Sequence, residues 1–423
     1  MKEATVELPF CIVLASVLLT AIVVSATPAY IIILNHGLVT EMVIAQSGSV
    51  DHIQQAVDEA IRLGRPGVKI PEGNFTFDAT GSRRVNINVP ATGLKIQGAG
   101  INRTVLQLPQ DETNSQTNMF NVDGKSHGKL VITGITFKGR AYVGSTTGDT
   151  GIFLGSCRDF RIYNCSFHDL GSAGIWIMDH WNLFGNGNSQ WVSQGVIDRC
   201  SFYNIFKQGA LDAKTGYGYG VDLGRCYNID YTPWETNMSK ILGVYDQNVF
   251  VEDCFFAACR HAVACSSGGV YVFRHNTVVK QAYNEIVLTG HPARGISATE
   301  GWTPSHRAYE VYDNVFDRSV AGGTVMKGIY CKGGGGVIYN NTFRGMNEAI
   351  NIGNAGCSDP RLVKCYVHDL YFWSNTLFNT PTLYSVLDAD ASTVPRAVLN
   401  VDFFPNAPAF NYTPYQYPHP LTQ

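Results

Sequence analysis

The sequence predicts an all-β solenoid, a stack of short-stranded coils, and three observations support this prediction. A short phrase recurs at unequal intervals, as FRIYNCSF at 160–167, YVFRHNTV at 271–278, YEVYDNVF at 309–316 and GVIYNNTF at 336–343. Within it, apolar and polar residues alternate with the period of two that is typical of strands. Glycine is abundant at 43 residues and aromatic residues make up 12%, which favours many strands joined by turns. Loops can vary in length while the strand register cannot, so unequal spacing fits stacked coils.

A column of asparagines and cysteines runs through the aligned phrases. Stacked side-chain amides, one per ~4.8 Å step, hydrogen-bond along the stack and hold a tight turn. We therefore interpret this column as scaffold. The cysteines in it lie close enough for disulfides, whose Cα atoms are about 4.4–6.8 Å apart, but buried thiols are the simpler interpretation. The column comprises Ile135, Cys165, Cys200, Cys254, Asn276, Asn314, Asn341 and Asn375.

One amphipathic helix is predicted within SVDHIQQAVDEAIRLGRPG at 49–67. Ser49 is the expected N-cap, and Gly64 with Pro66 ends the helix. A helix at this place would cover the exposed core at the first end of the solenoid. Its apolar positions follow helical spacing: Ile53, Ala56, Val57, Ala60 and Ile61.

This succession of motifs resembles the right-handed parallel β-helix proteins of the pectate-lyase-like superfamily. The similarity lies in IQQAVDEA, GVKIPEGNF, LKIQGAGINRTVL and coils ending in YNNTF, and it extends over residues 49–395. The resemblance implies a right-handed parallel β-helix of about eight or nine coils with an N-terminal capping helix. It leaves the activity open, because the superfamily includes lyases, hydrolases, epimerases, phage tailspikes and adhesins.

The two ends of the chain differ from the solenoid. Residues 8–26 are uncharged and mostly apolar, which fits a signal peptide within 1–27 as well as a retained membrane anchor. Either interpretation predicts an exported, secreted or cell-surface protein. After a linker at 28–48, the β-helix is expected over 49–400. The Pro- and aromatic-rich tail 401–423 is expected to lie along the coils or to close the last one.

Composition excludes some functions. The net charge is −3 and charged residues make up only 15%, so no nucleic-acid-binding surface is expected. No CxxC pair occurs among the 11 cysteines, which argues against a zinc site.

The candidate site lies on a second, glycine-led phrase that precedes most of the repeats, such as GIWI at 174–177 and GVDL at 220–223. If its aliphatic residues Ile152, Ile175, Val221, Ile286 and Ile350 face the core, the alternate positions face outward. A neighbouring outward row is expected to hold His261 and Glu285 one coil apart, joined by Lys327. The outward row itself is predicted to be Phe153, Trp176, Asp222, Val263, Val287 and Asn351.

Long loops follow the same strands and predict a walled groove. They span 179–193, 224–248 and 289–307. Their aromatic residues are suited to stacking on sugar rings, so a polysaccharide is the expected partner. The predicted substrate-binding residues are Phe153, Trp176, Trp181, Trp191, Trp302 and Arg307.

Two reactions suit these residues. A polyuronate lyase needs a base for the proton α to a carboxylate and a cation to neutralise that carboxylate. Calcium held by Asp179, Asp222 and Glu285 could supply that cation. A glycoside hydrolase instead needs two carboxylates facing the bond, a role open to Asp222 and Glu285 about two coils apart. The full set of catalytic candidates is His261, Glu285, Asp222, Lys327, Arg225 and His291.

The specific enzyme family is not identified by motif. The polygalacturonase set NTD, DD, GHG and RIK is absent, and WIMDHW at 176–181 has one residue more than the WIDH segment of pectate lyases. The leading hypothesis is a carbohydrate-active protein, with lyase preferred to hydrolase. The alternative is a non-catalytic glycan-binding, surface or filament-forming solenoid that forms homo-oligomers.

Overall fold

The computed structural model describes most of the chain after residue 40. Within 41–423 it omits 80–82, 111–116, 125–127, 141–147, 179–191, 206–217, 225–236, 247, 267, 280–284, 289–293, 298–300, 304–305, 319–326, 355–365 and 388–394. For 285, 286, 288, 294–297 and 301–303 it describes only the backbone. The apolar segment 8–26 and most of the linker thus lie outside the described residues. No helix within the described part is long and apolar enough to cross a membrane.

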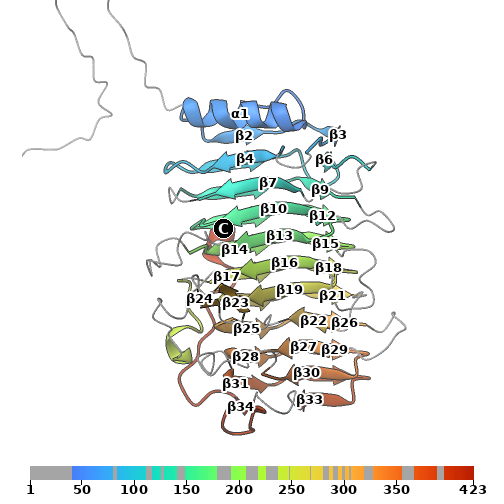
Figure 1. The fold of residues 1–423 in the computed structure, drawn as a ribbon, viewed down its shortest axis with the longest axis vertical. Helices are drawn as coiled ribbons and strands as arrows, with labels where there is room; N and C mark the ends of the chain where they lie inside the picture. Colours follow the sequence, from blue (N-terminus) through green and yellow to red (C-terminus); the bar gives the residue numbers. More distant parts are fainter. Residues whose placement is uncertain are drawn as a thin grey trace, which may run out of the picture. The chain divides into compact units, whose positions relative to one another are not determined.

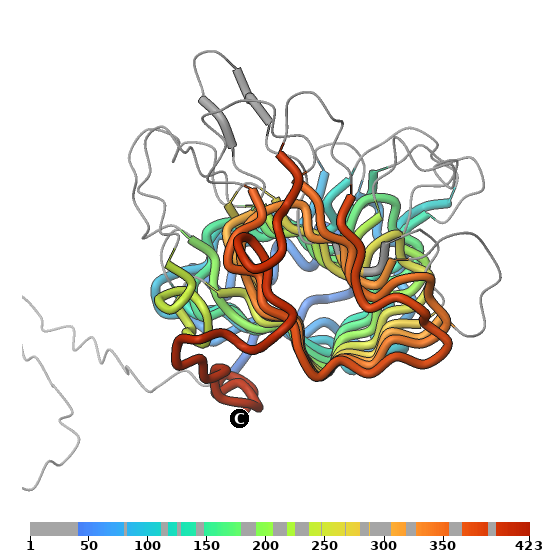
Figure 2. The backbone as a smooth tube through the Cα atoms, turned by 90° about the horizontal axis from the view of Figure 1, so that it is seen from below, coloured from blue at the N-terminus to red at the C-terminus, as the bar shows by residue number. Residues whose placement is uncertain are grey.

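Three long parallel sheets, A, B and C, form the walls of a stack of coils (Figures 1 and 2). Each coil passes through a strand of sheet A, then sheet B, then sheet C. The predicted right-handed parallel β-helix is confirmed. Sheet A has 12 strands and sheets B and C have 10 each, so the stack is longer than the eight or nine coils expected. The extra coils lie towards the ends, where the repeated phrase is weak.

The strands are short, and each sheet takes one from nearly every coil. Sheet A contains β1 (Val43–Ile44), β2 (Gly67–Lys69), β5 (Leu94–Gln97), β8 (Leu130–Thr133), β11 (Phe160–Tyr163), β14 (Gly195–Asp198), β17 (Val249–Glu252), β20 (Val270–Arg274), β25 (Ala308–Tyr312), β28 (Gly334–Tyr339), β31 (Val367–Trp373) and β34 (Phe403–Phe404). Sheet B contains β3 (Gly73–Thr76), β6 (Thr104–Gln107), β9 (Thr136–Lys138), β12 (Ser166–His168), β15 (Ser201–Tyr203), β18 (Phe255–Ala257), β21 (Thr277–Val279), β26 (Val315–Asp317), β29 (Thr342–Arg344) and β32 (Thr376–Phe378). Sheet C contains β4 (Val85–Asn88), β7 (Asn118–Asp123), β10 (Thr150–Gly155), β13 (Ala173–Met178), β16 (Tyr219–Gly224), β19 (His261–Ser266), β22 (Glu285–Leu288), β27 (Lys327–Cys331), β30 (Glu348–Ile352) and β33 (Thr382–Val386). A separate antiparallel pair, β23 (Arg294–Ser297) and β24 (Gly301–Thr303), lies in the loop after β22.

Helix α1 (Val50–Arg62) covers the first end of the stack, as predicted (Figure 1). Ser49 is its N-cap, and the Ser49 hydroxyl accepts a hydrogen bond from the His52 N–H. Gly64 follows the helix with φ +61, a conformation in which glycine avoids the strain of a side chain. The buried face of α1 consists of Val50, Ile53, Ala56, Val57 and Ala60.

Columns of like side chains fill the interior. The rings of Phe137, Phe167, Phe202 and Phe256 stack in sequence, with centroid separations of 5.1, 5.0 and 4.6 Å. All four are fully buried, so each coil completes the apolar surroundings of the next.

The predicted asparagine column is confirmed at the turn between sheets A and B. Asn314 Oδ1 accepts from the backbone N–H of Asn276 at 2.9 Å, and Asn341 Oδ1 accepts from that of Asn314 at 3.1 Å. Asn375 continues the ladder with a bond of 3.0 Å from the Asn341 N–H. The ladder thus satisfies turn amides that would otherwise be buried without partners.

The cysteines extend this ladder as thiols. Cys165, Cys200 and Cys254 are buried and form no disulfide with one another. Their Sγ atoms donate to backbone carbonyls; Cys254 Sγ, for example, lies 3.3 Å from the Glu252 oxygen. The simpler of the two interpretations of the column therefore holds.

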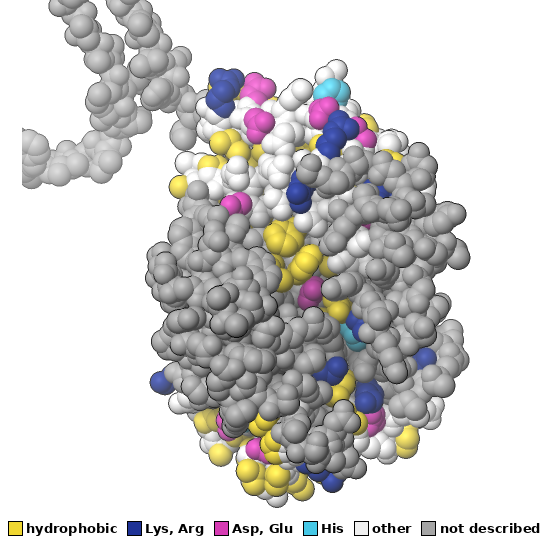
Figure 3. All heavy atoms as spheres, viewed as in Figure 1, with side chains coloured by type: hydrophobic (Ala, Val, Ile, Leu, Met, Phe, Trp, Pro, Cys, Tyr) yellow, Lys and Arg dark blue, Asp and Glu magenta, His cyan; other side chains and the backbone are white. Residues whose placement is uncertain are grey.

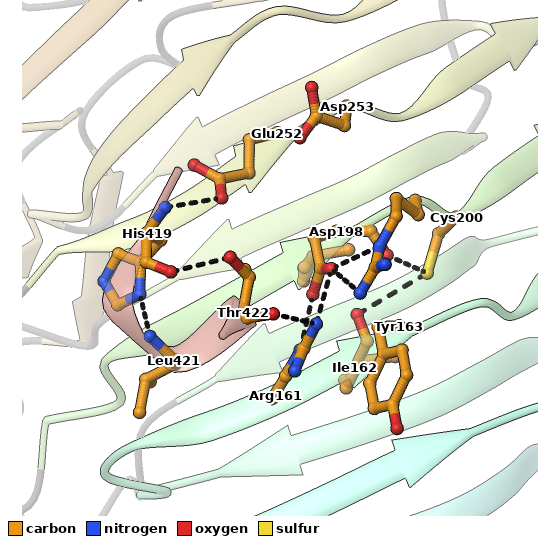
Figure 4. Close-up of polar contacts among 12 residues, drawn as sticks. Arg161, Ile162, Tyr163, Asp198, Cys200, Glu252, Asp253, His419, Leu421 and Thr422 are labelled. Carbon is orange, nitrogen blue, oxygen red and sulfur yellow. Dashed lines mark hydrogen bonds and ion pairs between the residues drawn. The ribbon is translucent and has the colours of Figure 1, made fainter. Parts of the chain in front are cut away.

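The C-terminal tail runs back along the outer face of sheet A after β34 (Figure 1). Tyr412 OH donates to Glu310 Oε2 at 2.6 Å, and further along His419 N–H donates to Glu252 Oε1 at 3.0 Å. The carbonyl of Thr422 then accepts from Arg161 Nη2 at 3.1 Å (Figure 4). The tail thus spans several coils, and β34 also pairs with β31 at the lower end.

Candidate functional site

The outer face of sheet C carries two rows of side chains in register. In the first row, Phe153 pairs with Trp176 and Trp176 with Asp222, on neighbouring strands. The two rings meet edge to face at 5.4 Å. The Trp176 Nε1 atom is buried, and no described residue accepts a hydrogen bond from it. The full row reads Asn86, Asn121, Phe153, Trp176, Asp222, Ala264, Leu288, Tyr330, Asn351 and Ser385.

The prediction that Val263 and Val287 belong to this outward row is wrong. Both pair in register with core positions, and both are fully buried in the main hydrophobic core. The predicted row is shifted by one residue along these two strands, because Ala264 and Leu288 occupy the outward position. Ala262 occupies the inward position held by Gly220 in the preceding coil, so the glycine that marks the phrase is missing there.

The second outward row contains the predicted His261, Glu285 and Lys327. Lys327 pairs with Glu285 on one side and with Glu348 on the other. His261 lies one coil above Glu285, because each stands two residues before a valine of the Val263–Val287 pair. The expected neighbourhood of these three positions is therefore confirmed at the level of the backbone. Figure 3 shows hydrophobic, acidic, histidine and basic side chains following one another down the middle of this face.

An aromatic–cationic cluster occupies the upper part of the second row. The rings of Tyr219 and His261 stack at 5.5 Å with an interplanar angle of 9°. Arg260 Nη1 donates to Tyr219 OH at 3.0 Å. Tyr219 and His261 are buried, which holds the two stacked rings in a fixed geometry, and the positive charge of Arg260 acts on the Asp222 carboxyl group.

Asp222 is the titratable group of the face that is suited to proton transfer near neutral pH. Burial raises its pKa to about 7, against the opposing effects of the Leu223 backbone N–H and the positive charge of Arg260. A carboxyl group with such a pKa serves equally as a general acid or a general base at neutral pH.

A closed ring of four polar side chains occupies the lower part of the face. Lys327 Nζ donates to Asn351 Oδ1 at 3.0 Å, and Asn351 Nδ2 donates to Ser385 Oγ at 2.7 Å. The Ser385 hydroxyl donates in turn to Glu348, whose other oxygen lies 3.8 Å from Lys327 Nζ. Lys327 also lies 4.8 Å from the centre of the Tyr330 ring. A cation is thus fixed against an aromatic face, an arrangement suited to binding an acidic sugar.

Other predicted site residues fall elsewhere or outside the described residues. Arg307 is buried just before β25 and belongs to neither row. Trp302 lies on β24, where only the backbone is described. The described part of the loop 224–248 does not wall this face, since Met238 and Tyr245 pack against sheet A. The residues that lie outside the described part are Asp179, Trp181, Trp191, Arg225 and His291.

The predicted calcium site is not formed by described side chains. Asp179 and the side chain of Glu285 lie outside them, which leaves Asp222 as the one described carboxylate of the predicted set. Among the described residues no three His, Cys, Asp or Glu side chains gather in a way that would hold a metal ion.

Five residues of the face escaped sequence reasoning: Tyr219, Arg260, Tyr330, Glu348 and Ser385. For two of these residues, the sequence does contain a signal, which is their position relative to the small inward residue of the strand. Tyr219 and Glu348 stand directly before the inward small residue of their strands, as His261 and Lys327 do. Reading that column through all coils would have recovered Tyr219 and Glu348.

Comparison with known proteins identifies solved structures of similar fold. No protein-family model matches the sequence, and no curated protein matches it either. The alginate lyase of Paenibacillus sp. str. FPU-7 is similar in structure, with a TM-score of 0.50 and 15% identity over 81% of this chain and 97% of that one. A mutant tailspike protein of E. coli bacteriophage HK620, in complex with a pentasaccharide, gives a TM-score of 0.51 and 15% identity. That match covers 77% of this chain and 53% of the tailspike.

The A-module of an Azotobacter vinelandii mannuronan C-5 epimerase is also similar, with a TM-score of 0.49 and 14% identity over 81% of this chain and 78% of that one. At these identities the likeness shows the fold alone. The chain has the right-handed parallel β-helix fold.

Proposed function

We propose that this chain is a carbohydrate-active protein that acts on an acidic polysaccharide along the outer face of sheet C, as a lyase in preference to a hydrolase. The observation that supports it is the second row, in which His261 and Lys327 lie two coils apart, with Asp222 in the neighbouring row one coil above His261. The similar folds of an alginate lyase and a pentasaccharide-binding tailspike lend further support.

In a lyase reaction the chain must move one proton and neutralise one carboxylate. A base removes the proton α to the uronate carboxylate, the C4–O bond breaks, a C4=C5 double bond forms, and the leaving oxygen takes up a proton. Lys327 is suited to hold the carboxylate, because its ammonium group is fixed by Asn351 at 3.0 Å. His261 and Asp222 are the candidates for the base and the acid; His261 lies two coils above Lys327 in the same row, and Asp222 lies one coil higher in the neighbouring row.

A hydrolase reaction remains the alternative within the same class. Asp222 is in register with Leu288 two coils below, and Glu285 stands three residues before Leu288, so the two backbones are roughly 14 Å apart by strand spacing. Their carboxyl groups reach the separation of about 6.5–9.5 Å of an inverting pair only if both side chains extend towards each other. The raised pKa of Asp222, about 7, suits the general acid.

Calcium is proposed only as an ion that binds the carboxylate of the substrate. Two coils separate Asp222 from Glu285, whereas ligands of one calcium ion lie 2.3–2.6 Å from it. The described residues alone therefore do not fit a calcium site, and no step above depends on the metal.

The full-length protein is to be incubated with pectate, alginate, other polyuronates and neutral glycans, with and without Ca²⁺. Growth of the ultraviolet absorbance of unsaturated uronate, lost in His261→Ala and Lys327→Ala, supports a lyase. Lys138→Ala, which removes a lysine from sheet B, is the matched control. Reducing ends without absorbance, lost in Asp222→Asn, indicate a hydrolase.

The second candidate function is a non-catalytic glycan-binding or filament-forming solenoid. It is favoured by the absence of the polygalacturonase motifs from the sequence. Retention on a polysaccharide column without any product would support it and overturn the enzyme. Export, attachment to a membrane through residues 8–26 and homo-oligomer formation belong to both candidates as proposals, and cell fractionation and light scattering test them.

A further inference from the structure

A pocket of about 200 Å³ opens on the outer face of sheet A, beside the end of the C-terminal tail. It belongs to a different wall of the coil from the two rows on sheet C. Strands β5, β8 and β11 supply its floor, and Leu421 of the tail forms one side. The polar and aromatic residues that line it are Lys95, Lys129, Asp159, Arg161 and Tyr163.

The side chains that line this pocket carry more positive than negative charge. Within the described part of the chain, no carboxylate lies within ion-pairing distance of Lys95 or Lys129. Asp159 is the acidic residue of the lining, and its Oδ1 already accepts from Tyr245 OH at 2.6 Å. Two lysines thus add positive charge to a concave surface, which attracts anions.

Arg161 adds a rigidly held cation to the pocket lining, and Figure 4 shows its contacts with Asp198 and Thr422. Its Nε and Nη2 donate to the two oxygens of Asp198 at 2.9 and 3.0 Å. Its guanidinium carbon lies 4.0 Å from the centre of the Tyr163 ring, and Nη2 also donates to the Thr422 carbonyl. The guanidinium is therefore held in one orientation before any ligand arrives, which reduces the entropy lost on binding.

The size of the pocket limits the ligand. A volume of about 200 Å³ equals roughly seven water molecules, and it is below the ~300–1,000 Å³ of sites for drug-sized ligands. One charged group with the atoms next to it fits, whereas an oligosaccharide does not.

We propose that this pocket is an anion-binding site that takes a single carboxylate or sulfate group, free or carried on a sugar, through Lys95, Lys129 and Arg161. It is separate from the site on sheet C, and it does not depend on the proposed function. Bound there, an acidic sugar at the end of a polysaccharide branch would give the solenoid a second point of attachment.

The test measures binding of sulfate, glucuronate and glucose to the full-length protein by calorimetry at low salt. We expect saturable binding of glucuronate, sulfate or both with a Kd of about 1 mM, and no binding of glucose. The variant Lys95→Gln/Lys129→Gln should weaken it by about five- to tenfold, because each lysine contributes a modest exposed charge interaction. The control Lys138→Gln/Lys240→Gln removes the same charge elsewhere, from β9 and from the 3₁₀ turn Met238–Lys240.

The outcomes separate the sources of the anion. Competition between sulfate and glucuronate identifies a general oxyanion site, and binding of glucuronate alone identifies a sugar-acid site; both support the proposal. Equal affinity in wild type and in Lys95→Gln/Lys129→Gln overturns it, as does the lack of saturation up to about 10 mM. Binding that is lost in Lys327→Gln belongs to sheet C and likewise overturns it.

Discussion

Arg274 and Glu252 form an ion pair in which neither side chain is exposed to solvent, at 0% for each. Arg274 Nε donates to Glu252 Oε2 at 2.8 Å. Arg274 also donates to the carbonyls of Tyr415 at 2.7 Å and Gln416 at 2.9 Å, and these belong to the tail. The pair and the tail therefore protect each other from water, and they are expected to unfold as one unit.

Replacing Arg274 with Ala should lower the free energy of unfolding by about 3–5 kcal/mol, because Glu252 is then left charged and buried. Arg103→Ala is the matched control, since its partner Glu72 is exposed and the expected loss is at most ~1 kcal/mol. Urea unfolding at neutral pH measures both. Similar losses in the two variants would contradict the coupling of the tail to the pair.

The tail also makes stability depend on pH through His419. Burial lowers the pKa of His419 to about 4, helped by the positive charge of Arg274. The unfolded chain therefore binds the proton more readily, and stability falls as the pH drops from about 6.5 towards 4. Burial raises the pKa of Glu252 and Glu310, which works in the opposite direction and makes stability rise as the pH falls.

Unfolding free energies at pH 7.5 and pH 4.5 isolate the contribution of His419. The loss of stability on acidification should be smaller in His419→Gln than in wild type, because the variant has no imidazole to protonate. An unchanged loss in the variant would show that other groups account for the pH dependence.

The asparagine ladder offers a prediction within a single column. Asn314 Nδ2 donates to the carbonyls of Phe273 and Tyr312, each at 2.9 Å, and Asn314 Oδ1 accepts a hydrogen bond from the N–H of Asn276. Asn314→Ala leaves these buried groups unpaired and should cost about 3–5 kcal/mol. Asn314→Cys should cost about half as much, because Cys254 shows that a thiol at this position still bonds to carbonyls. Equal losses in thermal or urea unfolding would refute the role of the thiol.

This ladder also explains why the fold was predictable from sequence. A turn that needs a buried amide or thiol at one position repeats its residue types in every coil, so Asn276, Asn314 and Asn341 reveal the stack without any structure. The capping helix was predictable for a similar reason, since its apolar stripe has the period of a helix and Ser49 is a strong N-cap.

The candidate site was predictable only in part. Where the glycine of the phrase is retained, as at Gly220, the outward position Asp222 follows directly. Where Ala262 replaces the glycine, the sequence-based assignment is shifted by one residue, and it wrongly places Val263 on the outer face. The ring of Lys327, Glu348, Asn351 and Ser385 joins three coils, and the sequence gives no measure of which side chains meet across coils.

Asp222 allows the two proposed reactions to be told apart by pH. With a pKa raised to about 7, it is mostly protonated below that pH and mostly ionised above it. If Asp222 is the base of a lyase, kcat/KM should rise with pH through about 7; if it is the acid of a hydrolase, kcat/KM should fall through the same range. The pH profile on the best polyuronate substrate measures this.

Asp222→Asn should lower kcat/KM by about 10²–10⁴-fold and remove the limb of the pH profile near 7. Folding should be unaffected or slightly strengthened above that pH, because the amide avoids the cost of burying an ionised carboxylate. Trp176→Phe, on the neighbouring strand, is the matched control: it keeps an aromatic face, so it should change KM while the pH profile keeps its limb. A limb near pH 7 that persists in Asp222→Asn would assign proton transfer to another group, with His261 as the next candidate on the same face.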